Sequence, residues 1–233
     1  MKVAVLGAME EEVELLKSSL EDLSSFSGAG MEVFEGRRNG IEVACARSGM
    51  GLVAAAAATQ FLIDSVAPDF LIFSGIAGAL RDGCGIGEVI VGEKVRFLDA
   101  DMELICQDNP HLSEFSSEPR LVETALKALE ELKIPHAAGI LASSNRFIGS
   151  AEAKEKARKD SGADGAEMEG GAFLQICAKN GLPALVLRTV SDGSSMEYSS
   201  FHHFDTSSYS RQSNRVVLKM LEILSPAKVG GRL

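Results

Sequence analysis

The chain has 233 residues, of which 45% are hydrophobic and 24% are charged. These proportions are ordinary for a globular protein and argue against an intrinsically disordered chain. The 23 Lys and Arg residues against 33 Asp and Glu residues give a formal net charge of −10. This acidic balance argues against nucleic acid or an anionic membrane surface as a partner, because both are bound through clustered basic side chains.

The sequence also bears on the compartment. The longest apolar stretch of low charge, 51–63, is too short to span a bilayer. The apolar run at the start of the chain follows a single positive charge and ends in three glutamates, which does not fit a secretory signal. The four cysteines include no CxxC pair. We therefore expect reduced thiols and a cytoplasmic protein.

Predicted strands and helices alternate along the chain. In chain order we expect a strand at 2–7, a helix at 10–20, strands at 31–37 and 41–47, a helix at 51–65, strands at 70–74 and 88–95, a loop at 99–117, a helix at 119–132, a strand at 136–142, helices at 151–159 and 169–180, a strand at 184–190 and a closing helix at 210–224. Asn39-Gly40 is a strong hairpin signal between the second and third strands.

This alternation predicts an α/β fold. A mixed β-sheet between layers of helices, a three-layer sandwich, is its natural architecture. The sequence has no obvious linker, low-complexity tract or internal repeat. We expect one domain over residues 1–233.

Three acidic residues stand out by their position relative to the predicted strands and helices. Glu12 falls within the apolar stripe of the first helix, and Glu169 shares its helical stripe with Phe173 and Ile176. Asp192 follows the strand 184–190, where ligands of open α/β sheets collect. Each also has a simpler interpretation, since acids favour the positive end of a helix, cap helices and form turns. A carboxylate on a buried face is costly unless it is paired, so function remains an alternative for all three.

Other chemical signatures are weak or missing. The stretch Ser74-Gly75-Ile76-Ala77-Gly78 lets the backbone approach a ligand closely, but it matches neither a dinucleotide fingerprint nor a phosphate loop. The sequence has no H-E-x-x-H motif and no Ser or Cys nucleophile motif, and His202 and His203 would point in different directions in a regular element. We expect no metal and no cofactor.

Six short motifs together carry a resemblance to a known family. They are Gly7-Ala8-Met9-Glu10-Glu11-Glu12, Ser48-Gly49-Met50-Gly51, Ser74-Gly75-Ile76-Ala77-Gly78, Asp99-Ala100-Asp101, Glu167-Met168-Glu169 and Arg188-Thr189-Val190-Ser191-Asp192. In this order the chain resembles the bacterial 5′-methylthioadenosine/S-adenosylhomocysteine nucleosidases of the purine and uridine phosphorylase superfamily. The resemblance runs from Met1 to the closing helix and implies a nucleoside phosphorylase-like fold.

The resemblance implies a role for each matching residue. Glu12 would activate the attacking water, Asp192 would protonate adenine at N7, and Glu169 would bind the ribose hydroxyls. Phe147 and Ile148 would stack on and hydrogen-bond the base, Met168 would lie beneath the ribose, and Met9 would line the water and sugar site. Arg188 would lie near the water, and Met50 and Phe201 would line the 5′-alkylthio pocket. The motif residues Ile76, Ala77, Gly78, Glu167 and Ser191 complete the expected substrate site.

These residue types suit the cleavage of a ribosyl bond to adenine. Bond breaking develops positive charge on the sugar and negative charge on the base. A general acid that protonates the adenine relieves the negative charge, and a carboxylate near the sugar stabilises the positive charge. We expect an apolar setting to keep Asp192 protonated near neutral pH.

The sequence departs from the family pattern at three places. Ile76 stands where Ser or Thr is frequent, Asn145 replaces a frequent Asp before Arg146 and Phe147, and the segment 193–204 with its two histidines matches poorly. These departures bear on the exact substrate more than on the reaction.

Rival functions stay open. Related phosphorylases hold phosphate with arginines in the first glycine turn and before the glycine-rich loop, where this chain has acidic and apolar residues, so water is favoured as nucleophile. Another 5′-modified adenosine such as aminofutalosine is an alternative substrate. A storage or binding protein of this fold should lack the three acids, and an oxidoreductase should carry the dinucleotide fingerprint. The resemblance also implies a homodimer in which the loop 99–117 closes the partner's 5′ pocket.

Overall fold

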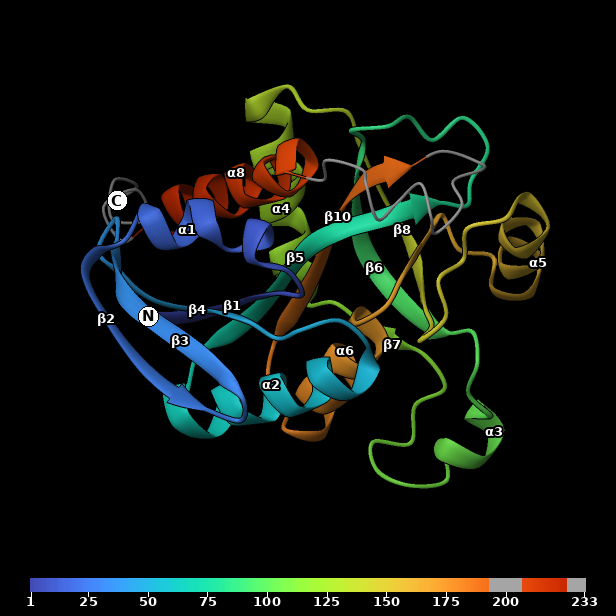
Figure 1. Cartoon of the computed structure of the whole chain (residues 1–233), viewed down its shortest axis with the longest axis horizontal. Helices are drawn as coiled ribbons and strands as arrows, with labels where there is room; N and C mark the ends of the chain where they lie inside the picture. Colours follow the sequence, from blue (N-terminus) through green and yellow to red (C-terminus); the bar gives the residue numbers. More distant parts are fainter. Residues whose placement is uncertain (193–206, 226–233) are drawn as a thin grey trace.

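The computed structural model describes residues 1–192 and 207–225. Figure 1 shows a central twisted sheet with helices on both faces. The elements in chain order are β1 (Lys2–Gly7), the 3-10 helix η1 (Glu10–Glu12), α1 (Glu14–Ser18), β2 (Glu21–Gly28), β3 (Met31–Arg38), β4 (Ile41–Arg47), α2 (Leu52–Val66), β5 (Phe70–Ala79), β6 (Val89–Phe97), α3 (Met102–Ile105), β7 (Phe115–Ser116), α4 (Pro119–Leu132), β8 (His136–Ser143), α5 (Ala151–Ser161), β9 (Gly165–Glu167), α6 (Gly170–Lys179), β10 (Ala184–Asp192) and α8 (Ser207–Ile223).

The sheet is mixed, as the sequence predicts. Strands β4, β1, β5 and β10 run parallel to one another in this spatial order, and the hairpin strands β3 and β2 extend the β4 edge in antiparallel fashion. At the other end, β10, β6, β8 and β9 pair in turn, and β9 pairs back with β5. This part of the sheet therefore closes on itself, which the sequence did not predict.

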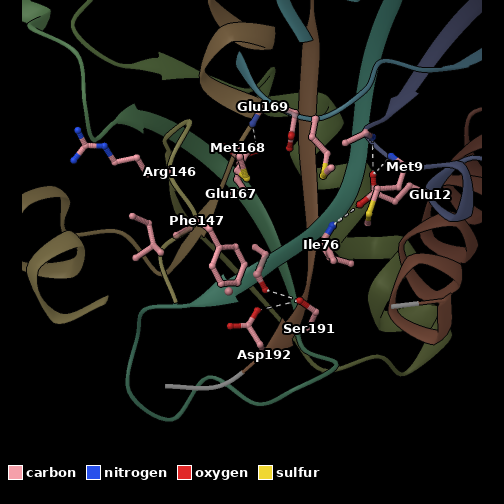
Figure 2. A pocket seen from close by; sticks show the side chains of 16 residues that line it. Met9, Glu12, Ile76, Arg146, Phe147, Glu167, Met168, Glu169, Ser191 and Asp192 are labelled. Carbon is pink, nitrogen blue, oxygen red and sulfur yellow. Dashed lines mark hydrogen bonds between the residues drawn. The ribbon is translucent and has the colours of Figure 1, made fainter. Parts of the chain in front are cut away.

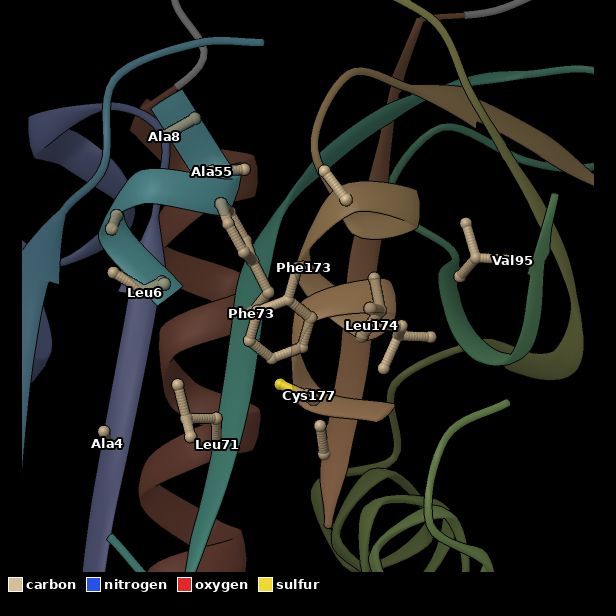
Figure 3. Packing of buried hydrophobic residues seen from close by; sticks show 14 of the residues in the cluster. Ala4, Leu6, Ala8, Ala55, Leu71, Phe73, Val95, Phe173, Leu174 and Cys177 are labelled. Carbon is tan, nitrogen blue, oxygen red and sulfur yellow. The ribbon is translucent and has the colours of Figure 1, made fainter. Parts of the chain in front are cut away.

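Alternating side chains of the buried strands feed two cores. Val3 and Val5 of β1 face the core beneath α1, α4 and α8. Ala4 and Leu6 face the opposite core beneath α2 and α6, as expected from the two-residue period of a strand. In the second core the rings of Phe73 and Phe173 meet edge to face at 5.4 Å between centroids (Figure 3).

Turn chemistry accounts for several element boundaries. Asn39 and Gly40 both have positive φ values, of 51° and 77°, as a two-residue hairpin between β3 and β4 requires. Helix α4 starts with Pro119 and ends at Lys133 in a left-handed conformation, close to the predicted helix at 119–132.

The structure differs from the predicted elements in several places. The helix expected at 10–20 is split, because Val13, with φ −126° and ψ −17°, separates η1 from α1. Strand β2 was not predicted, since its residues are mostly exposed and lack an apolar alternation. The region 99–117 contains the short helix α3 and strand β7 rather than loop alone.

Two further findings bear on the expectations from sequence. Among the described residues, no helix combines the length and apolar character needed to cross a membrane. All four cysteines are free, with Cys45 and Cys177 buried.

Candidate active site

A pocket opens at the edge of the sheet where the parallel strands β1, β5 and β10 end (Figure 2). It encloses about 650 Å³, including space open to solvent. Its lining residues are Ala8, Met9, Glu12, Met50, Ile76, Ala77, Gly78, Arg146, Phe147, Ile148, Ala166, Glu167, Met168, Glu169, Ser191 and Asp192. This edge is where ligands of open α/β sheets bind.

The pocket gathers most of the residues predicted as a site. Glu12, Glu169 and Asp192, which are 157 and 23 positions apart in sequence, all line it and are each at most 6% exposed. Arg188 lies behind the wall rather than in it, because its side chain is only 1% exposed and turned to the acids. Phe201, His202 and His203 lie outside the described residues.

Glu12 is held by backbone donors from two strand ends. Its Oε2 accepts hydrogen bonds from the N–H groups of Ala8 at 2.6 Å and Met9 at 3.0 Å, and its Oε1 accepts one from Ile76 at 3.1 Å (Figure 2). The carboxylate folds back over the turn after β1, at the end of the 3-10 helix η1. A Cβ at Gly75 would lie 2.7 Å from Oε1, so glycine is required for this close approach.

Burial raises the pKa of Glu12 above its ordinary value of 4.5. The positive charge of Arg188 and the three backbone N–H groups oppose this effect only in part. A carboxyl group whose pKa is raised is a better base than an exposed one, since it holds a proton more readily. Oε2 accepts two of these hydrogen bonds and Oε1 only one, so Oε1 keeps a lone pair for a water molecule.

Arg188 and Glu167 form a buried ion pair beneath the pocket. The guanidinium donates to Glu167 Oε2 from Nε at 3.2 Å and from Nη2 at 2.5 Å, and it lies 4.7 Å above the Phe73 ring. Glu167 Oε2 also accepts from the backbone N–H groups of Glu169 and Gly170, and Ser143 Oγ donates to its Oε1. The Glu167 carboxylate is thus occupied by protein donors, and it orients Arg188 and the start of α6.

The Glu169 carboxyl group contacts both Arg188 of the ion pair and the start of helix α2. Its Oε1 accepts from the N–H of Gly51 at 2.8 Å, and its Oε2 lies 3.6 Å from Arg188 Nη2. Burial, together with the negative charge of Glu167, raises the pKa of Glu169 to about 8. Near neutral pH this side chain can therefore donate or accept a hydrogen bond, which suits a ligand of hydroxyl groups.

Asp192 is paired with a charge, and the expectation of an apolar setting is wrong. Lys154 Nζ on α5 donates to its Oδ2 at 2.6 Å, and Ser191 Oγ lies 3.1 Å from its Oδ1. Both the Lys154 and the Asp192 side chains are 4% exposed. The Asp192 carboxyl group therefore lies in a buried ion pair and not in the apolar surroundings expected from the sequence.

Lys154 is the main residue of the site that the sequence analysis missed. The segment 151–159 is highly charged and reads as a solvated helix. The sequence contains only a weak signal for this residue. Lys154 shares one helical face with the small residues Ala157 and Ser161, and these three are the buried residues of α5. Ala8, Arg146 and Ala166 line the pocket as well, without a distinguishing pattern in the sequence.

Two of the three departures from the family pattern lie in the described part of the chain, and the third, the segment 193–204, lies outside it. Ile76 presents an apolar side chain to the pocket while its backbone N–H binds Glu12. Asn145 Oδ1 accepts from the N–H of Leu52 at 2.9 Å and so caps the start of α2. Asn145 is thereby a link between α2 and the loop that carries Phe147.

The described residues contain no group of three or more His, Cys, Asp or Glu side chains arranged to hold a metal ion. The chemistry available from this part of the chain is that of carboxyl groups, one buried arginine and one buried lysine. Two of the carboxyl groups, Glu12 and Asp192, reach the pocket from different strand ends (Figure 2). Such an arrangement can move a proton at each of two separated atoms of one ligand.

Solved structures of known enzymes are similar to this chain over nearly its whole length. A 5′-methylthioadenosine/S-adenosylhomocysteine nucleosidase from Neisseria meningitidis, in complex with methylthio-immucillin-A, is 31% identical with a TM-score of 0.89, covering 96% of this chain and 99% of its own. The corresponding enzyme from Colwellia psychrerythraea, in complex with adenine, is 32% identical with a TM-score of 0.88, covering 96% of each chain.

A third similar structure is that of an enzyme named for a different substrate. The futalosine hydrolase of Helicobacter pylori is 26% identical with a TM-score of 0.88, covering 96% of this chain and 98% of its own. The recognised relatives are therefore nucleosidase hydrolases of more than one specificity. They share the nucleoside phosphorylase-like fold that the sequence predicts.

The family model described as the phosphorylase superfamily matches residues 2–222, which include every residue of the described pocket. The match agrees with the six motifs, the mixed sheet and the position of the three acids at its carboxyl edge. The chain belongs to the phosphorylase superfamily.

Proposed function

We propose that this protein hydrolyses the N-glycosidic bond of 5′-methylthioadenosine and S-adenosylhomocysteine, releasing adenine and the 5′-thioribose. The observation that carries the proposal is the gathering of Glu12, Glu169 and Asp192, all buried, around one pocket at the carboxyl edge of the sheet. The similarity to two nucleosidases of this specificity supports it. Methionine salvage would be its biological setting.

We assign one residue of the pocket to each step of the reaction. Asp192 gives a proton to N7 of adenine, so that the base leaves without developing a full negative charge. Glu12 takes a proton from the attacking water, and Glu169 binds the ribose hydroxyls. Phe147 and Ile148 hold the base, while Met9 and Met168 line the sugar site.

The charges of the pocket favour water over phosphate as nucleophile. Arg188 is held by Glu167 at 2.5 Å and lies 3.6 Å from Glu169, so its charge is already balanced. Glu12 occupies the turn after β1 with its carboxylate against the ends of β1 and β5. A phosphate dianion at this position would be repelled by the carboxylate.

A second candidate substrate is aminofutalosine or another 5′-modified adenosine. The similarity to futalosine hydrolase supports this alternative. The base and ribose would bind as in the first proposal, because both substrates share them. Met50, which is 66% exposed at the rim of the pocket, is the described residue best placed to contact the 5′ group.

We also propose a cytoplasmic homodimer. Large apolar side chains are exposed at the start of α2 and around α3, namely Met50, Val53, Leu104, Ile105 and Leu112. A partner chain would remove this apolar surface from water and bring the loop 99–117 to the 5′ side of a pocket. Light scattering after size-exclusion chromatography tests this, and the mass of one chain at micromolar concentration would contradict it.

The reaction itself is tested by adenine release from methylthioadenosine, with and without phosphate, resolved by chromatography. We expect adenine and free methylthioribose without phosphate. Strict phosphate dependence with a sugar 1-phosphate would identify a phosphorylase instead. Absence of adenine in both conditions, followed by cleavage of aminofutalosine, would favour the second substrate, and no cleavage of any 5′-modified adenosine would indicate a binding protein.

The role of Asp192 is tested by Asp192→Asn. We expect turnover to fall about 10²- to 10⁴-fold, the usual contribution of a general acid, while a non-hydrolysable substrate analogue still binds. Asp160→Asn on exposed α5 is the matched control, since Asp160 pairs only with the surface Lys156 among described residues. Near-native turnover of Asp192→Asn would remove Asp192 from the mechanism.

A further inference from the structure

Lys154 is a buried lysine on α5, a helix whose other charged side chains face outward. Its Nζ is 2.6 Å from Asp192 Oδ2, and both side chains are 4% exposed. A buried ammonium is costly unless a carboxylate compensates it. The residue that compensates it here is the proposed general acid, so the ion pair belongs to the reaction centre and not only to the fold.

We propose that Lys154 is a positioning residue for the general acid, which aims the Asp192 carboxyl group and sets the alkaline limit of activity. The proposal rests on the proposed function, because it assumes that Asp192 donates a proton to the base. Lys154 does not line the pocket, so its proposed effect on the substrate passes through Asp192.

Three neighbours restrict the orientation of the Asp192 carboxyl group. Lys154 Nζ holds Oδ2, and Ser191 Oγ lies 3.1 Å from Oδ1. The backbone of Gly78 packs against the group so closely that a Cβ there would be 3.1 Å from Oδ2 and 3.3 Å from Oδ1. Rotation of the carboxyl plane would therefore break the contact with Lys154 or with Ser191, and a side chain at position 78 would crowd the carboxyl group.

The charge of Lys154 acts in two opposite directions. During proton transfer the Asp192 O–H bond breaks, its electron pair stays on the carboxylate oxygen, and an N–H bond forms at N7. The ammonium stabilises the carboxylate produced in this step, so it makes Asp192 a stronger acid. Between turnovers it also stabilises that carboxylate against reprotonation from water, so a smaller fraction of enzyme carries the needed proton at high pH.

Other charges around the pair are largely balanced among themselves. Outside the pocket, Lys154 lines a second cavity together with Arg81, Asp82, Cys84 and Glu155. Arg81 is paired with Glu88 and Asp164, and Asp82 with Arg158. Inside the pocket, Asp192 shares the lining with Arg146, Glu12 and Glu169. Within the described part of the chain, Lys154 is the cation in hydrogen-bond contact with the Asp192 carboxylate.

The test is the pH dependence of kcat/KM for methylthioadenosine in Lys154→Met, Lys154→Arg and the control Lys156→Met. Lys156 is on the same helix but is 75% exposed. We expect the alkaline limb of Lys154→Met to move up by about 1–3 pH units, the usual effect of one nearby opposite charge on a carboxyl group. Lys154→Arg and Lys156→Met should keep the limb of the native protein.

The expected profiles of the native protein and Lys154→Met cross. On the acid side the native protein is faster, because its acid is stronger and better aimed. On the alkaline side the ratio of variant to native kcat/KM rises by about tenfold for each unit by which the limb has moved, and the variant becomes faster once this gain exceeds its loss on the acid side. A purely structural role would lower kcat/KM at every pH without moving the limb, and that result would overturn the proposal.

Two further variants cover the cases in which Lys154→Met does not fold or Asp192 is not the general acid. Lys154→Gln, which retains a hydrogen-bond donor without the charge, replaces Lys154→Met if that variant does not fold by circular dichroism, and the same shift is expected. Asp192→Asn is measured alongside. If it retains turnover, the proposed role of Asp192 fails, whereas an inactive Asp192→Asn with an unmoved limb in Lys154→Met overturns only the role of Lys154.

Discussion

At the scale of single residues, the site depends on how each carboxyl group is compensated. Glu12 has three backbone N–H groups and a nearby guanidinium, whereas Asp192 has an ammonium and a hydroxyl. Around Glu12 the effect of burial exceeds that of these partners, so the pKa of Glu12 is raised. Around Asp192 a full positive charge lies in contact with the carboxyl group. The two proposed proton-transfer groups are both buried, but they differ in the partners that compensate them.

Glu12→Gln tests the proposed base. The amide has nearly the shape of the carboxyl group but cannot take a proton from water, so we expect kcat to fall about 10²- to 10⁴-fold. Binding of a non-hydrolysable analogue should persist, because Phe147, Asp192 and the ribose contacts are unchanged. Steady-state kinetics and calorimetric binding measure the two effects separately.

Glu11→Gln is the control for this change. Glu11 precedes Glu12 in η1 but is exposed, so its substitution removes the same charge without touching the pocket. Equal losses in both variants would mean that the net charge of η1, and not the carboxyl group of Glu12, supports turnover.

At the residue scale, the sequence contains a signal where one helical stripe or one motif carries it. Glu12, Glu169 and Asp192 line one pocket, and each follows a predicted strand or starts a predicted helix. Lys154 was missed, since its partner is 38 positions away and nothing in the local charge pattern distinguishes it from Lys156. Charge compensation is a tertiary property and is not visible in a single helix.

At the scale of elements, helix α2 is attached to the site by its first turn. The N–H of Gly51 binds Glu169, and the N–H of Leu52 binds Asn145. Both donors would otherwise lack an intrahelical partner. Gly51 itself has φ of 95°, so the entry to the helix requires glycine. The start of α2 therefore stabilises the position of Glu169 as much as Glu169 stabilises α2.

Asn145→Ala tests this attachment. Loss of the acceptor should cost about 1 kcal/mol, as for other helix caps, and lower Tm by about 2–4 °C for a chain of this size. Asn145→Asp should restore or exceed native stability, because a carboxylate accepts the same hydrogen bond and favours the positive end of a helix. Differential scanning calorimetry compares the three proteins. A Tm of Asn145→Ala equal to the native value would show that water replaces the cap.

Element prediction was most accurate for strongly patterned segments. The helix at α4 and the strands β1 and β4 were predicted within one residue, because an amphipathic period or an unbroken apolar run marks each of them. Strand β2 was not recognised, since an edge strand with exposed side chains owes its form to pairing with β3. The glycines of β5 were read as the end of the strand, although the strand continues to Ala79.

At the scale of the whole molecule, raised carboxyl pKa values make stability depend on pH. The pKa of Glu169 lies at about 8 against an ordinary value of 4.5, and that of Glu12 is also raised. Between these values the folded protein holds a proton that the unfolded chain has lost. Folding then takes up protons, and the free energy of unfolding falls as pH rises. Buried acids of the site are thus a cost to the fold that the two apolar cores offset.

We therefore expect Tm of the ligand-free protein to fall by several degrees between about pH 5 and pH 8. Glu169→Gln removes one of the responsible groups, so its Tm should fall less over this window and exceed the native Tm most at pH 8. Glu123→Gln on α4, where Glu123 is exposed, should retain the native slope. A native Tm that rises through the window would mean that Glu169 is ionised in the folded protein throughout, with Arg188 outweighing burial and the charge of Glu167.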